Sequence, residues 1–162
     1  MTSLQQARWL SLLVPSALLA GAYGSQFWGG LHPCEMCYWQ RWPHFAAIAL
    51  ALLSFAARGA PDKGRSFVWL AALAILASGL TGFYHAGVEL GIFEGLTQCT
   101  ADGGGGSGAE LIADILARPI VRCDEIQFSF LGISMAGWNA VLSTGFALLI
   151  SWLSLRRPRA RA

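Results

Sequence analysis

Charged residues are scarce in this chain of 162 residues. Asp, Glu, Lys and Arg make up only 12% of it, whereas a soluble globular domain carries about 25%. Hydrophobic residues make up 55%, so the composition is that of a membrane protein, and the length allows one domain. The net charge is +2, and because the basic residues form no nucleic-acid patch, we expect no binding to nucleic acid.

Several common functional signatures are also absent. The sequence contains no phosphate-binding loop, no His-Glu-x-x-His motif, no arrangement of the serine–histidine–acid type and no internal repeat. Tyr38, and not histidine, follows Cys37, so covalent haem attachment has no support. These absences argue against a nucleotide-binding protein, a zinc protease, a serine hydrolase and a c-type cytochrome.

Four uncharged stretches predict helices that cross a membrane. They run from Trp9 to Cys34, from Trp42 to Ala57, from Ser66 to Val88 and from Ile126 to Leu155. A spanning helix needs roughly 20 apolar residues, so we extend the second stretch back toward Cys37 and begin the last helix near Ala136. We therefore predict an all-α integral membrane protein, a four-transmembrane-helix bundle forming one domain over residues 1–162, with spans over about 9–28, 38–57, 66–87 and 136–155.

The basic residues indicate how these spans are oriented. Four spans put both termini on one side, and eight of the eleven Lys and Arg residues fall there or in the short middle loop, Arg58–Arg65. By the positive-inside rule this side is cytoplasmic. The loops over about residues 29–37 and 88–135, which carry all four cysteines, then face the other compartment, where disulfides can persist.

A cleaved signal peptide is the alternative for the first span. Arg8 precedes the apolar run, and small residues occur at Ala20, Gly21 and Ala22. The apolar run continues well past any such cleavage site, which favours a retained span. Cys34 faces outward in either case.

The long second outer loop has its own organisation. Gly103–Gly106 together with Ser107 and Gly108 predict a flexible hinge. The next segment, Ala109–Val121, has its apolar residues on one helical face and is ended by Pro119, which predicts a short amphipathic helix in the membrane interface. A helix packed on the loop itself is the alternative. Because Cys99 precedes the hinge and Cys123 follows the helix, the loop can bring these cysteines together or let them separate.

Cys34 and Cys37 form a Cys-x-x-Cys motif at the predicted start of a helix. Such a pair can close a small disulfide, and because a helix N-terminus stabilises a thiolate, motifs of this kind often have lowered thiol pKa values. Zinc binding and purely structural disulfides are the alternatives. A four-cysteine zinc site usually has two short-spaced pairs, whereas 23 residues, including the glycine run, separate Cys99 from Cys123. We therefore expect redox-active cysteines and no metal site.

Three further polar residues are candidates for binding a ligand near the outer ends of the spans. Arg41 lies one helical turn after Cys37, so the two side chains can share a face. A charge within a span is usually functional, and Arg41 can hold a thiolate or donate hydrogen bonds to a quinone carbonyl. An arginine that only anchors the helix at the interface is the alternative. His44 and His85 can hydrogen-bond the same ligand, although packing or anchoring more often explains histidines at an interface.

The combination of these features resembles the DsbB family of quinone-dependent, disulfide-generating membrane proteins of bacteria. The resemblance covers nearly the whole chain, and it implies a multi-pass protein of the bacterial inner membrane with cytoplasmic termini and periplasmic cysteines. It rests on the four-span plan, on Cys34 and Cys37 with Arg41 four residues later, on Cys99 and Cys123 in the second outer loop, and on Phe130-Leu131-Gly132 followed by Trp138 before the last span.

The resemblance also implies an electron relay. A reduced DsbA-like partner, a periplasmic thioredoxin-fold oxidase, would attack a disulfide between Cys99 and Cys123 and form a mixed disulfide with Cys99. Electrons would then pass to a Cys34–Cys37 disulfide through a transient Cys34–Cys123 bond. Cys37 would finally reduce a membrane quinone with support from Arg41. Ubiquinone is the expected quinone, and menaquinone is the alternative.

Two other functions compete with this relay. A membrane conduit that passes thiol reductant outward needs cysteines reachable from the inner side, and all four cysteines here map to the outer side. A nonenzymatic membrane protein with ordinary structural disulfides would use Arg41 only as an anchor. The resemblance also leaves open how broadly the protein acts. A family member dedicated to one special oxidase or substrate is as compatible with the sequence as one that serves a general oxidase.

Overall fold

The computed structural model describes residues 2–95 and 121–156. Cys99, the glycine hinge and nearly all of the predicted amphipathic segment 109–121 lie outside the described residues. Within the described ranges the chain forms four long helices, α1 (Ser3–Phe27), α2 (Glu35–Ala56), α3 (Arg65–Glu89) and α5 (Met135–Leu155), a short 3-10 helix η1 (Ala57–Gly59), and two short strands, β1 (Ser129–Phe130) and β2 (Ile133–Ser134).

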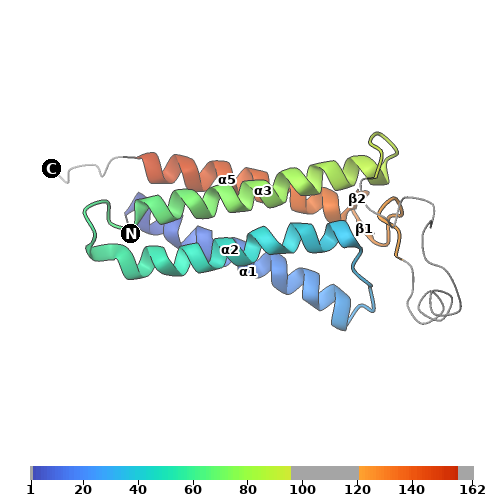
Figure 1. Cartoon of the computed structure of the whole chain (residues 1–162), viewed down its shortest axis with the longest axis horizontal. Coiled ribbons are helices and arrows are strands. Elements are labelled where there is room, and N and C mark those ends of the chain that lie inside the picture. The colour runs from blue at the N-terminus through green and yellow to red at the C-terminus, as the bar shows by residue number, and fades with distance from the viewer. Residues whose placement is uncertain (1, 96–120, 157–162) are drawn as a thin grey trace, which may run out of the picture.

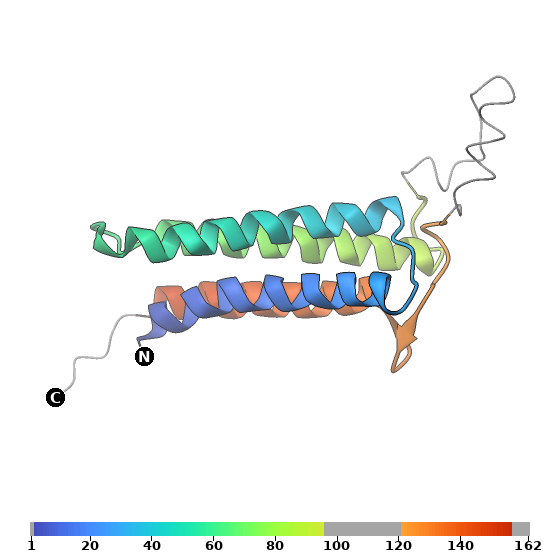
Figure 2. The ribbon, with the colours of Figure 1, turned by 90° about the horizontal axis from the view of Figure 1, so that it is seen from below.

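The four helices form a bundle of two layers. They run side by side along the long axis of the molecule (Figure 1), with α2 and α3 in one layer and α1 and α5 in the other (Figure 2). The start of α1 and the end of α5 lie at one end of the bundle, and the start of α2, the end of α3 and the β1–β2 hairpin lie at the other. We call the second end the thiol end, because Cys34 and Cys37 lie there at the start of α2.

Side-chain caps explain where two of the helices begin. The hydroxyl of Thr2 accepts a hydrogen bond from the backbone N–H of Gln5 at the start of α1 (3.2 Å), and the hydroxyl of Ser134 accepts one from Gly137 at the start of α5 (3.1 Å). Such caps contribute about 1 kcal/mol each. The cap at Thr2 places the start of α1 ahead of the predicted span, while the other three helices agree with their predicted spans to within a few residues.

The loop between η1 and α3 is fixed by Asp62. Its carboxylate accepts hydrogen bonds from the Ser66 hydroxyl (2.6 Å) and from the backbone N–H groups of Ser66 (2.9 Å) and Gly64 (3.0 Å). These bonds, that of the Ser66 hydroxyl foremost, lower the pKa of Asp62 to about 2. Gly64 has a φ of 72°, a left-handed conformation that glycine adopts without strain. The basic loop therefore turns directly into α3.

The bundle places small residues inside and large apolar residues outside. In water such a surface would favour aggregation, but it suits lipid, because membrane helices pack through small side chains. The buried core includes Ala7, Ala47, Val68, Ala71, Ala72, Ile75, Ala147 and Ile150. The exposed surface includes Leu13, Leu52, Leu70, Leu80, Phe83, Val141 and Leu148.

Glycines allow α3 and α5 to approach each other closely. A Cβ atom added at Gly79 would lie 2.6 Å from the hydroxyl oxygen of Thr144, and one added at Gly82 would lie 3.0 Å from the backbone oxygen of Ala136. A larger residue at either position would force the helices apart. This close approach follows the small-residue packing of membrane helix pairs.

Three of the described helices, α1, α3 and α5, are long and apolar enough to cross a membrane. This confirms the prediction of a largely helical protein with membrane-spanning helices. α2 has 22 residues, but it falls outside this set because Gln40, Arg41 and His44 interrupt its apolar sequence. All three of these side chains are buried within the bundle.

The β1–β2 hairpin is an element that the sequence analysis missed. Ser129 pairs with Ser134 and Phe130 pairs with Ile133. Leu131 and Gly132 connect the strands with φ values of 54° and 79°, the positive values that a two-residue type I′ turn requires at both positions. The uncharged stretch before α5 therefore turns back on itself at the thiol end.

Candidate active site around Cys34 and Cys37

Cys34 and Cys37 lie in the first turn of α2. The Cys34 sulfur caps the helix by accepting a hydrogen bond from the backbone N–H of Cys37 (3.2 Å), and the two sulfur atoms lie 2.7 Å apart. A disulfide bond is about 2.05 Å long, so a small movement of the side chains closes it. The positive end of the helix dipole favours a thiolate at this position. The pair can therefore alternate between dithiol and disulfide with little backbone movement.

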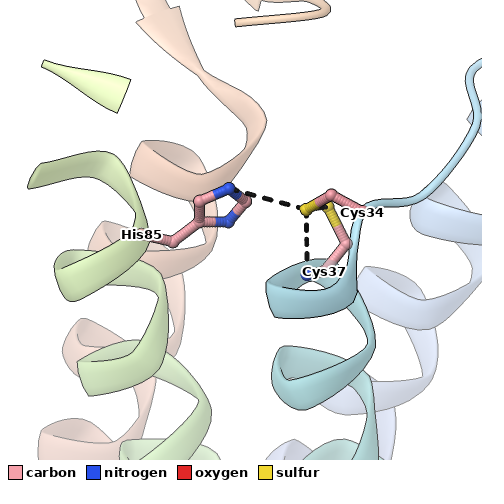
Figure 3. Close-up of side chains that lie close together, drawn as sticks. All are labelled: Cys34, Cys37 and His85. Carbon is pink, nitrogen blue, oxygen red and sulfur yellow. Dashed lines mark hydrogen bonds between the residues drawn. The ribbon is translucent and has the colours of Figure 1, made fainter. Parts of the chain in front are cut away.

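His85 of α3 faces this pair across the bundle (Figure 3). Its Nε2 lies 3.6 Å from the Cys34 sulfur, and its Nδ1 lies 2.7 Å from the Gln40 side-chain nitrogen. Gln40 is oriented by Asn139, whose Nδ2 donates to Gln40 Oε1 (2.8 Å). Because the Gln40 nitrogen donates to Nδ1, the neutral His85 ring carries its proton on Nε2, the nitrogen that lies beside Cys34.

Cys123 joins the same cluster from the other loop. It is fully buried and packs with Cys34, Met36 and Val88. A hydrogen bond with Cys123, then one with Cys37 and burial, raise the pKa of the Cys34 thiol. Three of the four predicted redox cysteines are thus in one place, and Cys34 keeps its proton in the reduced site. The fourth, Cys99, lies outside the described residues.

Arg41 is buried between α1 and α2, with only 7% of its surface exposed. Its Nη1 donates to the side-chain oxygen of Gln26 (2.7 Å), and its Nη2 donates to the backbone oxygen of Ala22 (3.4 Å). The guanidinium also lies over the rings of Tyr23 and Tyr38, 4.7 and 5.2 Å from their centroids. A side chain that reaches out to the interface as an anchor would not be buried in this way.

His44 belongs to a polar network between α2, α3 and α5. Its Nε2 lies 3.1 Å from Asn139 Oδ1 and 2.9 Å from the Ser78 hydroxyl. Asn139 Oδ1 also accepts from the Ser143 hydroxyl (2.7 Å), so Nε2 is the donor in its contact with this oxygen. In the neutral ring Nδ1 is then an acceptor, and among the described residues it has no hydrogen-bond partner. Such a buried acceptor is suited to a ligand hydroxyl.

A cavity of about 260 Å³ opens beside the cysteine pair. An apolar cavity of about 150 Å³ can hold a benzene molecule, so this one has room for a substituted ring. It brings together the two cysteines and all three predicted ligand-binding residues. The lining includes Ala22, Leu31, Cys34, Cys37, Gln40, Arg41, His44, His85, Glu89, Met135, Trp138 and Asn139.

Four polar residues of this site were missed by the sequence analysis: Gln26, Gln40, Glu89 and Asn139. Gln26 and Asn139 are uncharged and therefore did not interrupt the uncharged stretches, and Gln40 lies just before one of them. A signal was nevertheless present, because polar side chains within a predicted span usually face the bundle interior and mark functional positions. Glu89 follows His85 by four residues, which places both on one helical face.

These features define a class of protein: a helical membrane protein with a cysteine pair, one member buried and the other half-buried, beside a ring-sized cavity. A family model described as disulfide bond formation protein DsbB matches residues 5–153. The chain therefore belongs to the DsbB family, and it is an integral membrane protein.

Individual relatives carry the same name. Disulfide bond formation protein B of Chromobacterium violaceum is 32% identical, over 91% of this chain and 93% of the relative. The proteins of that name from Marinobacter nauticus, with 96% of each chain covered, and from Azoarcus sp., with 88% and 87% covered, are each 30% identical. No solved structure matches the chain.

Proposed function

We propose that this protein oxidises a DsbA-like periplasmic thiol oxidase and passes the electrons to a membrane quinone. The net reaction converts one partner dithiol and one quinone into one partner disulfide and one quinol. The observation that carries this proposal is the cavity of about 260 Å³ into which Cys34 and Cys37 open beside Arg41, His44 and His85. A redox-active thiol pair beside a ring-sized cavity in a membrane protein suits a lipid-soluble oxidant.

The relay begins at the loop cysteines. A partner thiolate attacks the Cys99–Cys123 disulfide at Cys99, and Cys123 leaves as a thiolate. Cys123 then attacks Cys34, which releases Cys37, and the second partner thiol displaces Cys99. Cys99 next attacks Cys123, so the loop disulfide forms again and Cys34 and Cys37 are left as the dithiol. The packing of Cys123 against Cys34 supports the step in which these two cysteines exchange.

The cavity residues fit a quinone head group. The structural sign of this fit is the buried His44 Nδ1, an acceptor that has no hydrogen-bond partner among the described residues. A quinone, when bound, accepts two electrons and two protons from the dithiol. Arg41 supplies N–H donors and a positive charge for a carbonyl oxygen, and His44 Nδ1 supplies an acceptor for a hydroxyl. The proton kept on Cys34 lies beside the Cys37 sulfur, 2.7 Å away, and so favours Cys37 as the thiolate of the pair. We propose ubiquinone, with menaquinone as the alternative.

We further propose that all four helices span the bacterial inner membrane as one domain over residues 1–162. The polar side chains of α2 are buried, and its outward surface carries Trp39, Trp42, Phe45 and Leu52, so the helix presents an apolar face to lipid. The thiol end then faces the periplasm, and the termini face the cytoplasm. This orientation keeps the three described cysteines away from the cytoplasmic side. A reductant conduit, in contrast, would need cysteines that can be reached from that side.

The test mixes the purified protein with a reduced DsbA-like partner and ubiquinone, and follows quinone absorbance and partner thiols together. We expect two partner thiols to be lost for each quinone, and both losses to be abolished by Cys37→Ser. Loss of thiols without loss of quinone would assign the electrons to another acceptor. Loss of neither would refute the relay and leave a membrane protein with structural disulfides.

A further inference from the structure

Glu89 adds to the thiol site a carboxylate that the proposed relay does not use. Its side chain is 7% exposed, and its Oε1 lies 3.8 Å from His85 Nε2. Its other oxygen, Oε2, has no hydrogen-bond partner among the described residues. Glu89 lines the cavity together with Cys34, Cys37 and His85. A buried carboxylate oxygen without a donor is unfavourable, and a bound cation would satisfy it.

Three of the proposed donor atoms lie close enough together to share one metal ion. The ligand atoms of Cys34, Cys37 and His85 all lie within 4.8 Å of one another. Zinc bonds are about 2.3 Å long to sulfur and about 2.0–2.1 Å long to nitrogen or oxygen. At tetrahedral angles these lengths place a sulfur ligand about 3.6 Å from a nitrogen ligand, and a nitrogen ligand about 3.4 Å from an oxygen ligand. The Cys34–His85 distance is 3.6 Å and the His85–Glu89 distance is 3.8 Å.

The cysteine pair must open and the Glu89 carboxylate must approach the sulfurs to complete this geometry, because Glu89 lies outside the set of mutually close donors. The sulfur atoms of the pair are 2.7 Å apart, and two thiolates on one tetrahedral zinc are separated by about 3.8 Å. His85 must also shift its proton from Nε2 to Nδ1, and the Gln40 amide must turn so that its oxygen accepts that proton. A metal-bound histidine usually donates its second ring N–H to an acceptor of this kind.

We propose that the reduced Cys34–Cys37 pair, His85 and Glu89 bind one thiophilic divalent cation of the Zn²⁺ class. The two thiols release two protons on binding, and no electrons are transferred. The disulfide form cannot bind the ion in this way, because its sulfurs carry no charge. The sequence led us to expect no metal site, so this proposal departs from that expectation. Its ligands also differ from the four-cysteine zinc site that was considered from the sequence.

The proposed function gives this binding a consequence. An ion held by Cys34 and Cys37 keeps the dithiol out of the relay, so Zn²⁺ would inhibit quinone reduction reversibly. This consequence rests on the proposed function, whereas the binding itself does not.

The experiment uses the full chain in detergent with both loop cysteines replaced (Cys99→Ser and Cys123→Ser), so that Cys34 and Cys37 are the only thiols. Cd²⁺ alone is titrated, without quinone or partner, and thiolate-to-cadmium absorption in the ultraviolet is followed. We expect one ion per chain in the dithiol form and none in the disulfide form. Failure here would leave the quinone assay untouched, and failure of that assay would leave this binding untouched.

Ligand variants identify the remaining donors. His85→Asn and Glu89→Gln should each weaken Cd²⁺ binding by about 10-fold or more, the effect expected when a metal site loses a supporting group. The exposed residues His32 and Glu35 supply matched controls, and His32→Asn and Glu35→Gln should leave binding within about twofold. Equal affinity in all four variants would show an ion held by the thiols alone and would overturn the proposal, as would equal binding to the disulfide form. Circular dichroism checks that each variant keeps its helices.

Discussion

Replacing Arg41 with methionine tests whether the cavity binds quinone through a fixed cation. Methionine fills much of the same space but removes the charge and the N–H groups that now donate to Gln26 (2.7 Å) and Ala22 (3.4 Å). A hydrogen bond to a charged group contributes about 1.5–3 kcal/mol. Loss of one such bond to the quinone therefore lowers kcat/KM for quinone by about 10- to 150-fold.

The assay separates this effect from general damage. Stopped-flow mixing with excess partner measures attack at Cys99, which should be unchanged, and steady-state rates at varied ubiquinone give kcat/KM. Arg8→Met is the matched control. Like Arg41, Arg8 is buried, donates to a backbone oxygen (that of Lys63) and lies over an aromatic ring (Phe55). Unlike Arg41, it lies near the start of α1, at the opposite end of the bundle from the thiols. Quinone kinetics that are unchanged in Arg41→Met, or equally reduced in Arg8→Met, would refute the assigned role of Arg41.

Three further predictions concern the loop, the packing and the pH dependence. Cys123→Ser leaves Cys99 as a free thiol, which should attack the disulfide of the oxidised partner and hold it as a mixed disulfide visible on a nonreducing gel; absence of that adduct would contradict the loop's role. Gly79→Ala should lower thermal stability by about 1–3 kcal/mol through overpacking, whereas Gly21→Ala, where a Cβ meets nothing within 4 Å, should not. Hydrogen bonds from the first turn of α3 lower the pKa of Asp62 to about 2, so their stabilisation is present above about pH 4 and is lost as the pH falls toward 2. Asp62→Asn should flatten the melting temperature over that window, and an unchanged profile would reject the assignment.

Helix positions were predictable from the sequence because uncharged runs of span length leave few other structures possible in a bilayer. α3 and α5 follow their predicted spans closely. The β1–β2 hairpin was not predictable in the same way, because the residues before α5 are also uncharged and apolar. Its turn depends on positive φ values at Leu131 and Gly132, and a leucine at such a position is uncommon.

Proximity within the site was only partly predictable. The spacing of Cys34, Cys37 and Arg41 along one helix fixed their order but not their partners. The structure shows that Arg41 faces α1, where Gln26 and Ala22 accept its hydrogen bonds. His85 comes to Cys34 from another helix, 51 positions along the chain, and such a distance depends on helix packing that periodicity does not specify.

The polar residues of α2 explain how a helix of unsuitable composition can lie in a lipid environment and why the thiols lie where they do. Arg41 bonds to α1, Gln40 bonds to α3 and α5, and His44 bonds to α3 and α5. Each such bond between membrane helices contributes only about 0.6 kcal/mol on average, but together they fix the rotation of α2 about its own axis. That rotation sets the direction in which the first turn presents Cys34 to His85. Loss of the network would therefore separate the thiols from the imidazole before it unfolded the bundle.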